Sequence, residues 1–179
     1  MDKVGIPRSL FYYYYGDIWK SFLSSLKIPY IVSPKTDKSI MEKGIKKAGD
    51  EMCLSLKDYL GHVDYLMDKC DLLLVPRISN YKTNNQTCTN FWASYDIVNN
   101  LYDKKIISYN IDYEKGETLK KGLYKIGKEL GKDKKEIKKA YKKAIYEHNL
   151  IKNKNIEITK NKLKSSKTKI LIVSHPYNT

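Results

Sequence analysis

The chain has 179 residues, of which 41% are hydrophobic and 30% are charged, and its formal net charge at pH 7 is +14. This length allows one α/β domain with a full hydrophobic core, and no apolar run approaches the ~20 residues of a membrane-spanning helix. The three cysteines are an odd number and no secretory signal precedes Met1. We therefore expect a cytoplasmic protein with a natural N-terminus and reduced thiols rather than a disulfide framework.

Strands and helices alternate along the chain. We predict strands at 4–6, 29–32, 71–75 and 105–111. Amphipathic helices are predicted for the segment from Ile18 to Leu26, for the segment from Ile40 to Ala48 with Thr36 or Asp37 as its cap, and at 54–68, 91–101, 116–130 and 133–150 with a continuation to about 163. A polar loop is predicted for 79–89. This alternation predicts right-handed βαβ units and an α/β fold, with a Rossmann- or flavodoxin-like parallel sheet flanked by helices.

Composition divides the chain into three predicted parts. Residues 1–115 are expected to form the α/β domain, and residues 116–168 a lysine-rich helical connector. Ile170 to Val173 are apolar and Pro176 follows them, as in a buried strand that ends at a proline. We therefore expect residues 169–179 to be the first strand of a second α/β domain whose remainder is missing.

The positive charge is concentrated near the C-terminus. Residues 132–169 contain fourteen lysines and four acidic residues, which account for +10 of the net charge. Nucleic-acid surfaces usually add arginines or interleaved aromatic residues, but this segment has no arginine. Its two aromatics, Tyr141 and Tyr146, fall on a helical stripe with apolar neighbours. We interpret the segment as a solvated helix, which makes nucleic acid an unlikely partner.

Each of the two arginines follows an apolar strand and a proline. Proline lacks the N–H that a strand ladder needs, so we predict that Arg8 and Arg77 project into loops at the carboxyl edge of the sheet, where ligands bind in open α/β folds. His175 follows the last apolar segment in a similar way. Planar guanidinium groups suit phosphate or carboxylate, so Arg8, Arg77 and His175 are candidate anion-binding residues. The alternative is that each arginine clamps loop carbonyls or pairs with Asp50 or Glu51.

The cysteines differ in their predicted surroundings. Cys53 lies in the turn that opens the helix at 54–68, and Cys88 lies just before the helix at 91–101. The N–H groups at a helix start stabilise a thiolate, which suits a nucleophile or a metal ligand. Cys70 precedes a buried strand and is predicted to be a small packing residue. The spacing of Cys53 and Cys88 matches no zinc pattern, so two structural thiols remain the alternative.

Several distinctive segments occur in a fixed order. They are Val4-Gly5-Ile6-Pro7-Arg8 with Tyr12 to Tyr15, Gly16 and Trp19; Asp50-Glu51-Met52-Cys53; Lys57 with Tyr59-Leu60-Gly61-His62-Val63; Val75-Pro76-Arg77; the Cys88 segment; and Val173-Ser174-His175-Pro176-Tyr177-Asn178. In this order they resemble the acyl-CoA dehydratase activase-related proteins, the DUF2229 family. That family is similar to the iron–sulfur subunits of 2-hydroxyacyl-CoA dehydratases and to double-cubane cluster proteins.

The resemblance implies cubane iron–sulfur chemistry in which an ATP-dependent activase reduces the cluster. It implies that Cys53 and Cys88 are metal ligands. Because a cubane takes three or four thiolates, the cluster is expected to be incomplete in this chain. The implied partners are the activase ATPase, the missing second α/β domain, an acyl-CoA or other anionic ligand, and a second copy of the chain. Ser55 stands where the family pattern has a proline.

Three functions follow from these observations. The first is an iron–sulfur protein of low-potential electron transfer or dehydration, of which this chain is the N-terminal part and is inactive alone. The second is a non-catalytic accessory or scaffold domain associated with an activase ATPase, and the third is a lysine-rich nucleic-acid-binding protein. The sequence specifies no catalytic acid or base. His62, within an amphipathic segment, is predicted to be a packing histidine.

Overall fold

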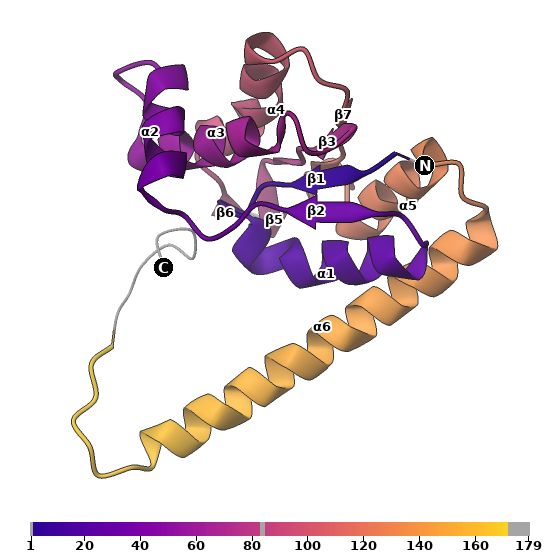
Figure 1. Cartoon of the computed structure of the whole chain (residues 1–179). Coiled ribbons are helices and arrows are strands. Elements are labelled where there is room, and N and C mark those ends of the chain that lie inside the picture. The colour runs from indigo at the N-terminus through magenta and orange to yellow at the C-terminus, as the bar shows by residue number, and fades with distance from the viewer. Residues whose placement is uncertain (1, 83–84, 172–179) are drawn as a thin grey trace.

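A four-stranded parallel sheet forms the centre of the molecule (Figure 1). The computed structural model describes residues 2–82 and 85–171. The strand order is β2-β1-β3-β7, and every neighbouring pair is parallel. The four strands are β1 (Val4–Ile6), β2 (Tyr30–Val32), β3 (Leu72–Leu74) and β7 (Ile106–Ile107). The predicted α/β fold with a Rossmann- or flavodoxin-like parallel sheet is confirmed.

Six helices flank the sheet within the described residues. They are α1 (Tyr12–Ser25), α2 (Lys38–Lys47), α3 (Leu54–Leu66), α4 (Thr89–Leu101), α5 (Leu119–Glu129) and α6 (Lys134–Leu163). Helix α6 packs on α1 and α5, whereas α3 packs on α2 and α4. Figure 1 shows α1 and α6 on one side of the strands and α2, α3 and α4 on the other. Asp37 caps α2 by accepting from Ile40 N, as predicted.

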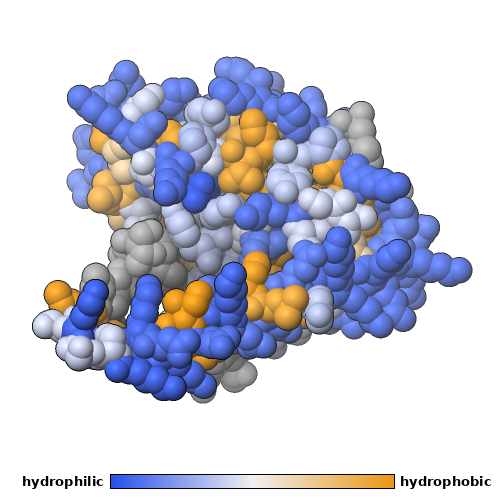
Figure 2. Space-filling model, turned by 60° about the horizontal axis from the view of Figure 1, so that its bottom comes forward, coloured by the Kyte–Doolittle hydropathy of each residue, from blue (hydrophilic) through white to orange (hydrophobic). Residues whose placement is uncertain are grey.

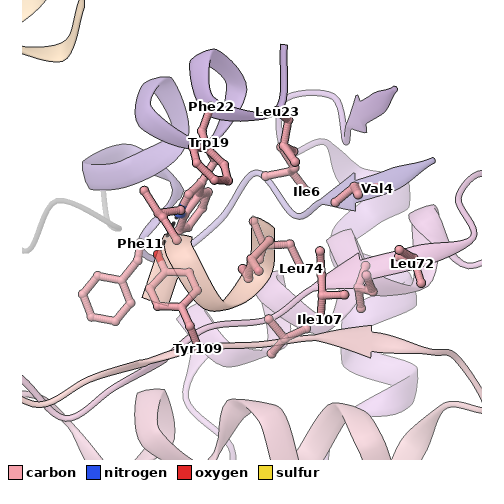
Figure 3. Close-up of a cluster of buried hydrophobic side chains, with 14 of the residues drawn as sticks. Val4, Ile6, Phe11, Trp19, Phe22, Leu23, Leu72, Leu74, Ile107 and Tyr109 are labelled. Carbon is pink, nitrogen blue, oxygen red and sulfur yellow. Dashed lines mark hydrogen bonds between the residues drawn. The ribbon is translucent and has the colours of Figure 1, made fainter. Parts of the chain in front are cut away.

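The hydrophobic core includes buried residues from the sheet and from α1, α3, α4, α5 and α6, and Figure 3 shows a part of it that includes residues of α1 and the sheet. Strands β1 and β3 are buried along their whole length, as strands covered on both faces should be. Helix α1 turns Trp19, Phe22 and Leu23 toward them. The indole Nε1 of Trp19 donates to Tyr109 Oη at 2.8 Å, so the buried polar atoms of this pair satisfy each other. Burial raises the pKa of the Tyr109 phenol.

The third and fourth predicted strands continue past a break. Strand β4 (Arg77–Ile78) pairs in parallel with β8 (Asn110–Ile111). The prediction that Arg77 lies in a loop is therefore wrong. Pro76 removes one N–H from the ladder, but Val75 N and Arg77 N donate to Ile107 O and Tyr109 O on either side of it. Pairing thus resumes after the proline instead of ending there.

The predicted polar loop at 79–89 contains a short antiparallel pair. Strand β5 (Asn80–Lys82) pairs with β6 (Asn85–Gln86). Thr87 Oγ1 donates to Ile78 O at 2.5 Å, and Thr87 N donates to Ser79 O at 2.7 Å. These bonds return the chain to β4 directly before α4, so the segment that leads to Cys88 is anchored to the sheet.

Helix α6 is one continuous helix, and the predicted continuation to about 163 is confirmed. Asp133 and Glu136 form a capping box at its start. Its buried residues, Ile137, Ala140 and Ala144, all lie in its first half. The first half of α6 therefore packs onto the α/β core, whereas residues 149–163 are exposed. The division into parts at 115 and 168 stays a prediction.

The predicted strand from Ile170 to Val173 has only two described residues. Ile170 and Leu171 are each 86% exposed and belong to no strand. The rest of that segment, with His175, lies outside the described residues. Within residues 2–82 and 85–171, none of the helices combines the length and hydrophobicity that a membrane span requires.

Candidate functional site

The order of the sheet reverses between β1 and β3. The chain leaves β1 for β2 on one side of the sheet, and it leaves β3 for β7 on the other. In open α/β sheets this reversal opens a crevice at the carboxyl ends of the two strands, where ligands bind. Arg8 follows β1 and Arg77 follows β3. Because these strands are parallel neighbours, both arginines lie beyond the same edge of the sheet, as predicted.

Two exposed cysteines occupy the N-cap positions of helices that begin at this edge. Cys53 is the N-cap of α3 and Cys88 is the N-cap of α4. Asn90, in the first turn of α4, donates through Nδ2 to Cys53 Sγ at 3.9 Å. This contact places the start of α4 beside the start of α3. Both cysteines therefore lie at helix N-termini, where the partial positive charge of the helix dipole is located.

The third cysteine lies at the opposite end of the sheet. Cys70 is buried against Gly5, and its thiol donates to Leu66 O at 3.2 Å. Burial raises the pKa of the Cys70 thiol, and the nearby charge of Lys104 only partly offsets this. The prediction that Cys70 is a packing residue is confirmed.

The carboxyl edge carries two exposed cysteines of the described chain, Cys53 and Cys88. A cubane takes three or four thiolates. Across residues 2–82 and 85–171, no three His, Cys, Asp or Glu side chains are grouped so as to hold a metal ion. The role of Cys53 and Cys88 as metal ligands therefore stays a prediction.

Arg8 is held at the edge by its backbone. Its N–H donates to Ser33 Oγ at 2.7 Å, and its guanidinium carbon lies 5.7 Å from the centroid of the Tyr12 ring. Among the described residues, Arg8 Nε is buried without a hydrogen-bond partner. A half-buried guanidinium with an unsatisfied donor suits an anionic ligand. This geometry agrees with the predicted anion-binding role of Arg8, which stays a prediction.

Arg77 already has a carboxylate partner. Its Nη2 lies 2.6 Å from Asp96 Oδ1, and its guanidinium carbon lies 4.4 Å from the centroid of the Tyr95 ring. The ring of Trp92 is 5.8 Å away on the same helix. The alternative prediction was that Arg77 pairs with Asp50 or Glu51, but in the structure its partner is Asp96 of α4. Anion binding by Arg77 must compete with this ion pair.

A polar network that the sequence analysis missed fixes the loop after β1. Ser9 Oγ donates to Asp58 Oδ2 at 2.6 Å. His62 is fully buried and joins Ser33 Oγ through Nδ1 at 2.8 Å and Thr36 Oγ1 through Nε2 at 3.0 Å. Through Asp58 and His62 of α3, the network joins this helix to the loop after β1, the loop after β2 and the approach to α2. The prediction that His62 is a packing histidine is confirmed.

Asp58 brings a partly buried carboxylate into this network. Burial opposes its ionisation, but the nearby His62 imidazole and the hydrogen bond from Ser9 together outweigh burial, so the pKa of Asp58 lies below its ordinary value. Asp58 Oδ1 lies 3.5 Å from His62 Nε2, farther than Thr36 Oγ1, and it has no hydrogen-bond partner among the described residues. Asp58 and His62 are four residues apart on α3, a spacing that places both on one helix face and that the sequence does show.

His175 is the third predicted anion-binding residue, and it lies outside the described residues. Of the tyrosines at the start of α1, Tyr12 and Tyr15 are half-buried, whereas Tyr13 and Tyr14 are exposed by 43% and 45%.

The fold and this edge define an α/β protein with a parallel sheet whose candidate ligand site is built from two helix starts that carry thiols. The chain belongs to the family described as the CoA enzyme activase uncharacterised domain (DUF2229), whose model matches residues 3–179. This confirms the family that the ordered segments predicted. No curated protein and no solved structure matches the chain.

Proposed function

We propose that this activase-related domain supplies two thiolate ligands, Cys53 and Cys88, to an iron–sulfur cluster of a CoA-enzyme system. The observation that carries the proposal is the contact between Asn90 Nδ2 and Cys53 Sγ at 3.9 Å. It joins the starts of α3 and α4, each of which has an exposed cysteine as its N-cap. Both cysteines thus lie at the carboxyl edge of the sheet, which is where ligands bind in open α/β folds.

The local electrostatics support the same proposal. A helix N-terminus carries a partial positive charge, and Cys53 and Cys88 are the N-cap residues of two helices whose starts are in contact through Asn90. An iron–sulfur cluster with thiolate ligands is anionic, and hydrogen bonds to its sulfurs tune its reduction potential. Asn90 already donates to the Cys53 sulfur. The chain therefore offers ligands, a hydrogen-bond donor and a favourable field at one place.

The residues of this chain would hold and orient the bound groups. When bound, a cluster of this kind supplies low-potential electrons or a Lewis acid for dehydration of a CoA thioester. Cys53 and Cys88 bind it, and the remaining thiolates come from a second α/β domain or a second copy of the chain. Arg8, with its unsatisfied Nε, binds an anionic group of the acyl-CoA ligand. The partner that delivers electrons is an ATP-dependent activase.

Anaerobic reconstitution of this chain with ferrous iron and sulfide tests the cluster proposal. The iron and acid-labile sulfide retained after desalting are measured, and alkylation followed by mass mapping reports which thiols are protected. We expect retained iron, with less than one full cluster per chain, and selective protection of Cys53 and Cys88. Cys53→Ser and Cys88→Ser should lose the iron, whereas the matched control Cys70→Ala should keep it. Iron that survives the double variant Cys53→Ser/Cys88→Ser would contradict the proposal.

The second candidate function is a non-catalytic accessory domain of the activase system. The observation that favours it is that the described residues bring no third ligand to Cys53 and Cys88. This function predicts no iron in any variant and unprotected thiols throughout. The same reconstitution therefore separates the two candidates.

A further inference from the structure

A long groove separates α1 from the second half of α6. Its volume is about 880 Å³. One wall is the tyrosine run at the start of α1, and the other is a single face of α6 formed by His148, Ile151, Lys152, Asn155, Ile156, Thr159 and Lys160. In Figure 1, α6 diverges from α1 toward its C-terminal end. It lies away from Cys53 and Cys88 and plays no part in the proposed cluster site.

The α6 wall continues a face that is already used for packing. Ile137, Ala140 and Ala144 lie on the face that packs against the core, and His148, Ile151 and Asn155 extend it at helical spacing. Two contacts mark the point where packing ends: Ser21 Oγ donates to Glu147 Oε2 at 2.5 Å, and His148 Nδ1 lies 2.7 Å from Asp17 Oδ2. Beyond this point the same face is no longer covered by α1.

Apolar side chains remain exposed along this wall. Ile151 is 47% exposed and Ile156 is 43% exposed. Figure 2, which brings this side of the molecule forward, shows hydrophobic patches between hydrophilic residues along the lower part of the surface. A solvated lysine helix needs no isoleucines on the face that would point at the domain. From His148 to Lys160 the wall is about 18 Å long, which is the length of about three helical turns.

The charged residues that line the groove are mostly lysines. Lys20, Lys152 and Lys160 line it, and among its described lining residues Asp17 is the one carboxylate. Asp17 is already bonded to His148 and to Ile18 N. The groove therefore combines an apolar floor with a positive rim, whereas a small polar ligand would need buried polar groups to orient it. An amphipathic helix with an apolar face and acidic flanks matches both properties.

We propose that the groove between the tyrosine run of α1 and residues 148–160 of α6 docks an acidic amphipathic helix of a partner protein. The apolar face of the partner helix packs on Ile151, Ile156 and the tyrosine rings. Its carboxylates pair with Lys20, Lys152 and Lys160 at the rim. This docking extends the α1–α6 contact by adding a third helix along the face that α1 leaves uncovered.

A designed peptide tests the proposal on the full chain. The probe is a helix of about 14 residues, long enough to span about 20 Å, with leucine at every third and fourth position and glutamate elsewhere. Controls are a scrambled peptide of the same composition and a version with lysine in place of glutamate. Binding is measured by fluorescence anisotropy. We expect the probe to bind at least about tenfold more tightly than either control.

Matched variants on α6 locate the binding face. Ile156→Glu, in the groove, should weaken probe binding by at least about tenfold, because it places a carboxylate against the acidic peptide. Ile158→Glu is the control, because Ile158 is similarly exposed, at 41%, but does not line the groove. Circular dichroism of both variants checks that the helix is intact. Equal effects of the two substitutions, or equal binding of the scrambled peptide, would overturn the proposal.

Two further outcomes would assign the groove to another occupant and so overturn the proposal. Self-association in analytical ultracentrifugation that Ile156→Glu abolishes and Ile158→Glu does not would identify a second copy of the chain. Probe binding that occurs only after removal of residues 172–179 would identify the chain's own terminal segment. Iron content is unrelated to either result, so this test stands apart from the test of the cluster.

Discussion

The two ends of the sheet place the same kind of residue in opposite surroundings. At the amino end, Cys70 is buried against Gly5, and its thiol bonds to a helix carbonyl. At the carboxyl end, Cys53 and Cys88 are exposed at helix starts. Parallel strands make this difference systematic, because each helix returns antiparallel to the strands and begins at their carboxyl edge. The end of the sheet at which a cysteine lies thus decides whether it is buried or exposed.

The carboxyl end also carries the buried polar groups of this part of the fold. Ser9, Ser33, Asp58 and His62 form a network there, whereas the amino end around Cys70 is closed mainly by packing. We therefore expect the stability of the carboxyl end to depend on its buried hydrogen bonds. We expect the stability of the amino end to depend on close packing of its side chains. Four experiments test this contrast, from the largest expected effect to the smallest.

The largest effect is expected for His62→Ala. The imidazole is fully buried and joins Ser33 and Thr36, so its removal leaves buried polar atoms unpaired. We expect the free energy of unfolding to fall by about 3 kcal/mol, measured by urea denaturation. His148→Ala is the control, because His148 is 31% exposed and pairs with Asp17 at the surface. Its loss should stay below about 1 kcal/mol, and equal losses for the two histidines would contradict the contrast.

The amino end is tested by Gly5→Ala. An added Cβ would lie 2.6 Å from Cys70 Sγ, so we expect a loss of about 2 kcal/mol in unfolding free energy. Cys70→Ala in the same chain should recover about 1 kcal/mol of that loss, because it removes the clashing sulfur. At Gly49 a Cβ meets nothing within 4 Å, so Gly49→Ala should not destabilise the protein. A loss at Gly5 that Cys70→Ala leaves unchanged would place the clash elsewhere.

The cysteines themselves give a smaller effect. Cys70→Ala should lower the free energy of unfolding by about 1 kcal/mol, because it leaves a small cavity and removes the hydrogen bond to Leu66 O. Cys53→Ala and Cys88→Ala should each change it by less than about 0.5 kcal/mol, because both side chains are exposed. Chemical denaturation of the three variants measures the difference. A large loss for Cys53→Ala or Cys88→Ala would show that packing, not ligand binding, is their role.

The smallest effect concerns acid. The pKa of Asp58 in the folded protein is below 3.8, its ordinary value. Its ionised form therefore stabilises the fold above pH 3.8, and this stabilisation is lost as pH falls through the folded-state pKa. Asp58→Asn should flatten the acid limb of stability measured against pH. Ser9→Ala removes a hydrogen bond that lowers this pKa, so it should move the acid loss to higher pH. Parallel acid limbs for Asp58→Asn and the unchanged protein would contradict the assignment.

The sequence predicted the parallel sheet and the amphipathic helices well because those features repeat over short distances. Alternating strand and helix patterns, Asp37 as a cap and the run of α6 to Leu163 are all local signals. The position of Cys53 and Cys88 at helix starts follows from the same local pattern.

The polar network was missed because its parts are distant in the chain. Ser9 and Asp58 are 49 residues apart, and Ser33 and His62 are 29 apart, so only the folded chain shows that they meet. Arg77 was misplaced for a related reason. A proline ends a ladder only if no pairing resumes beyond it, and that depends on the distant partner strand β8.

The continuous course of α6 has a mechanical consequence. The helix is anchored through Ala144 and is unsupported by the core beyond His148. From Ala144 to Leu163 it extends about 29 Å as a single rod. A tilt of about 10° at Ala144 would therefore displace Leu163 by about 5 Å. A small change in how the buried first half of α6 packs on α1 and α5 would thus be magnified along its exposed second half.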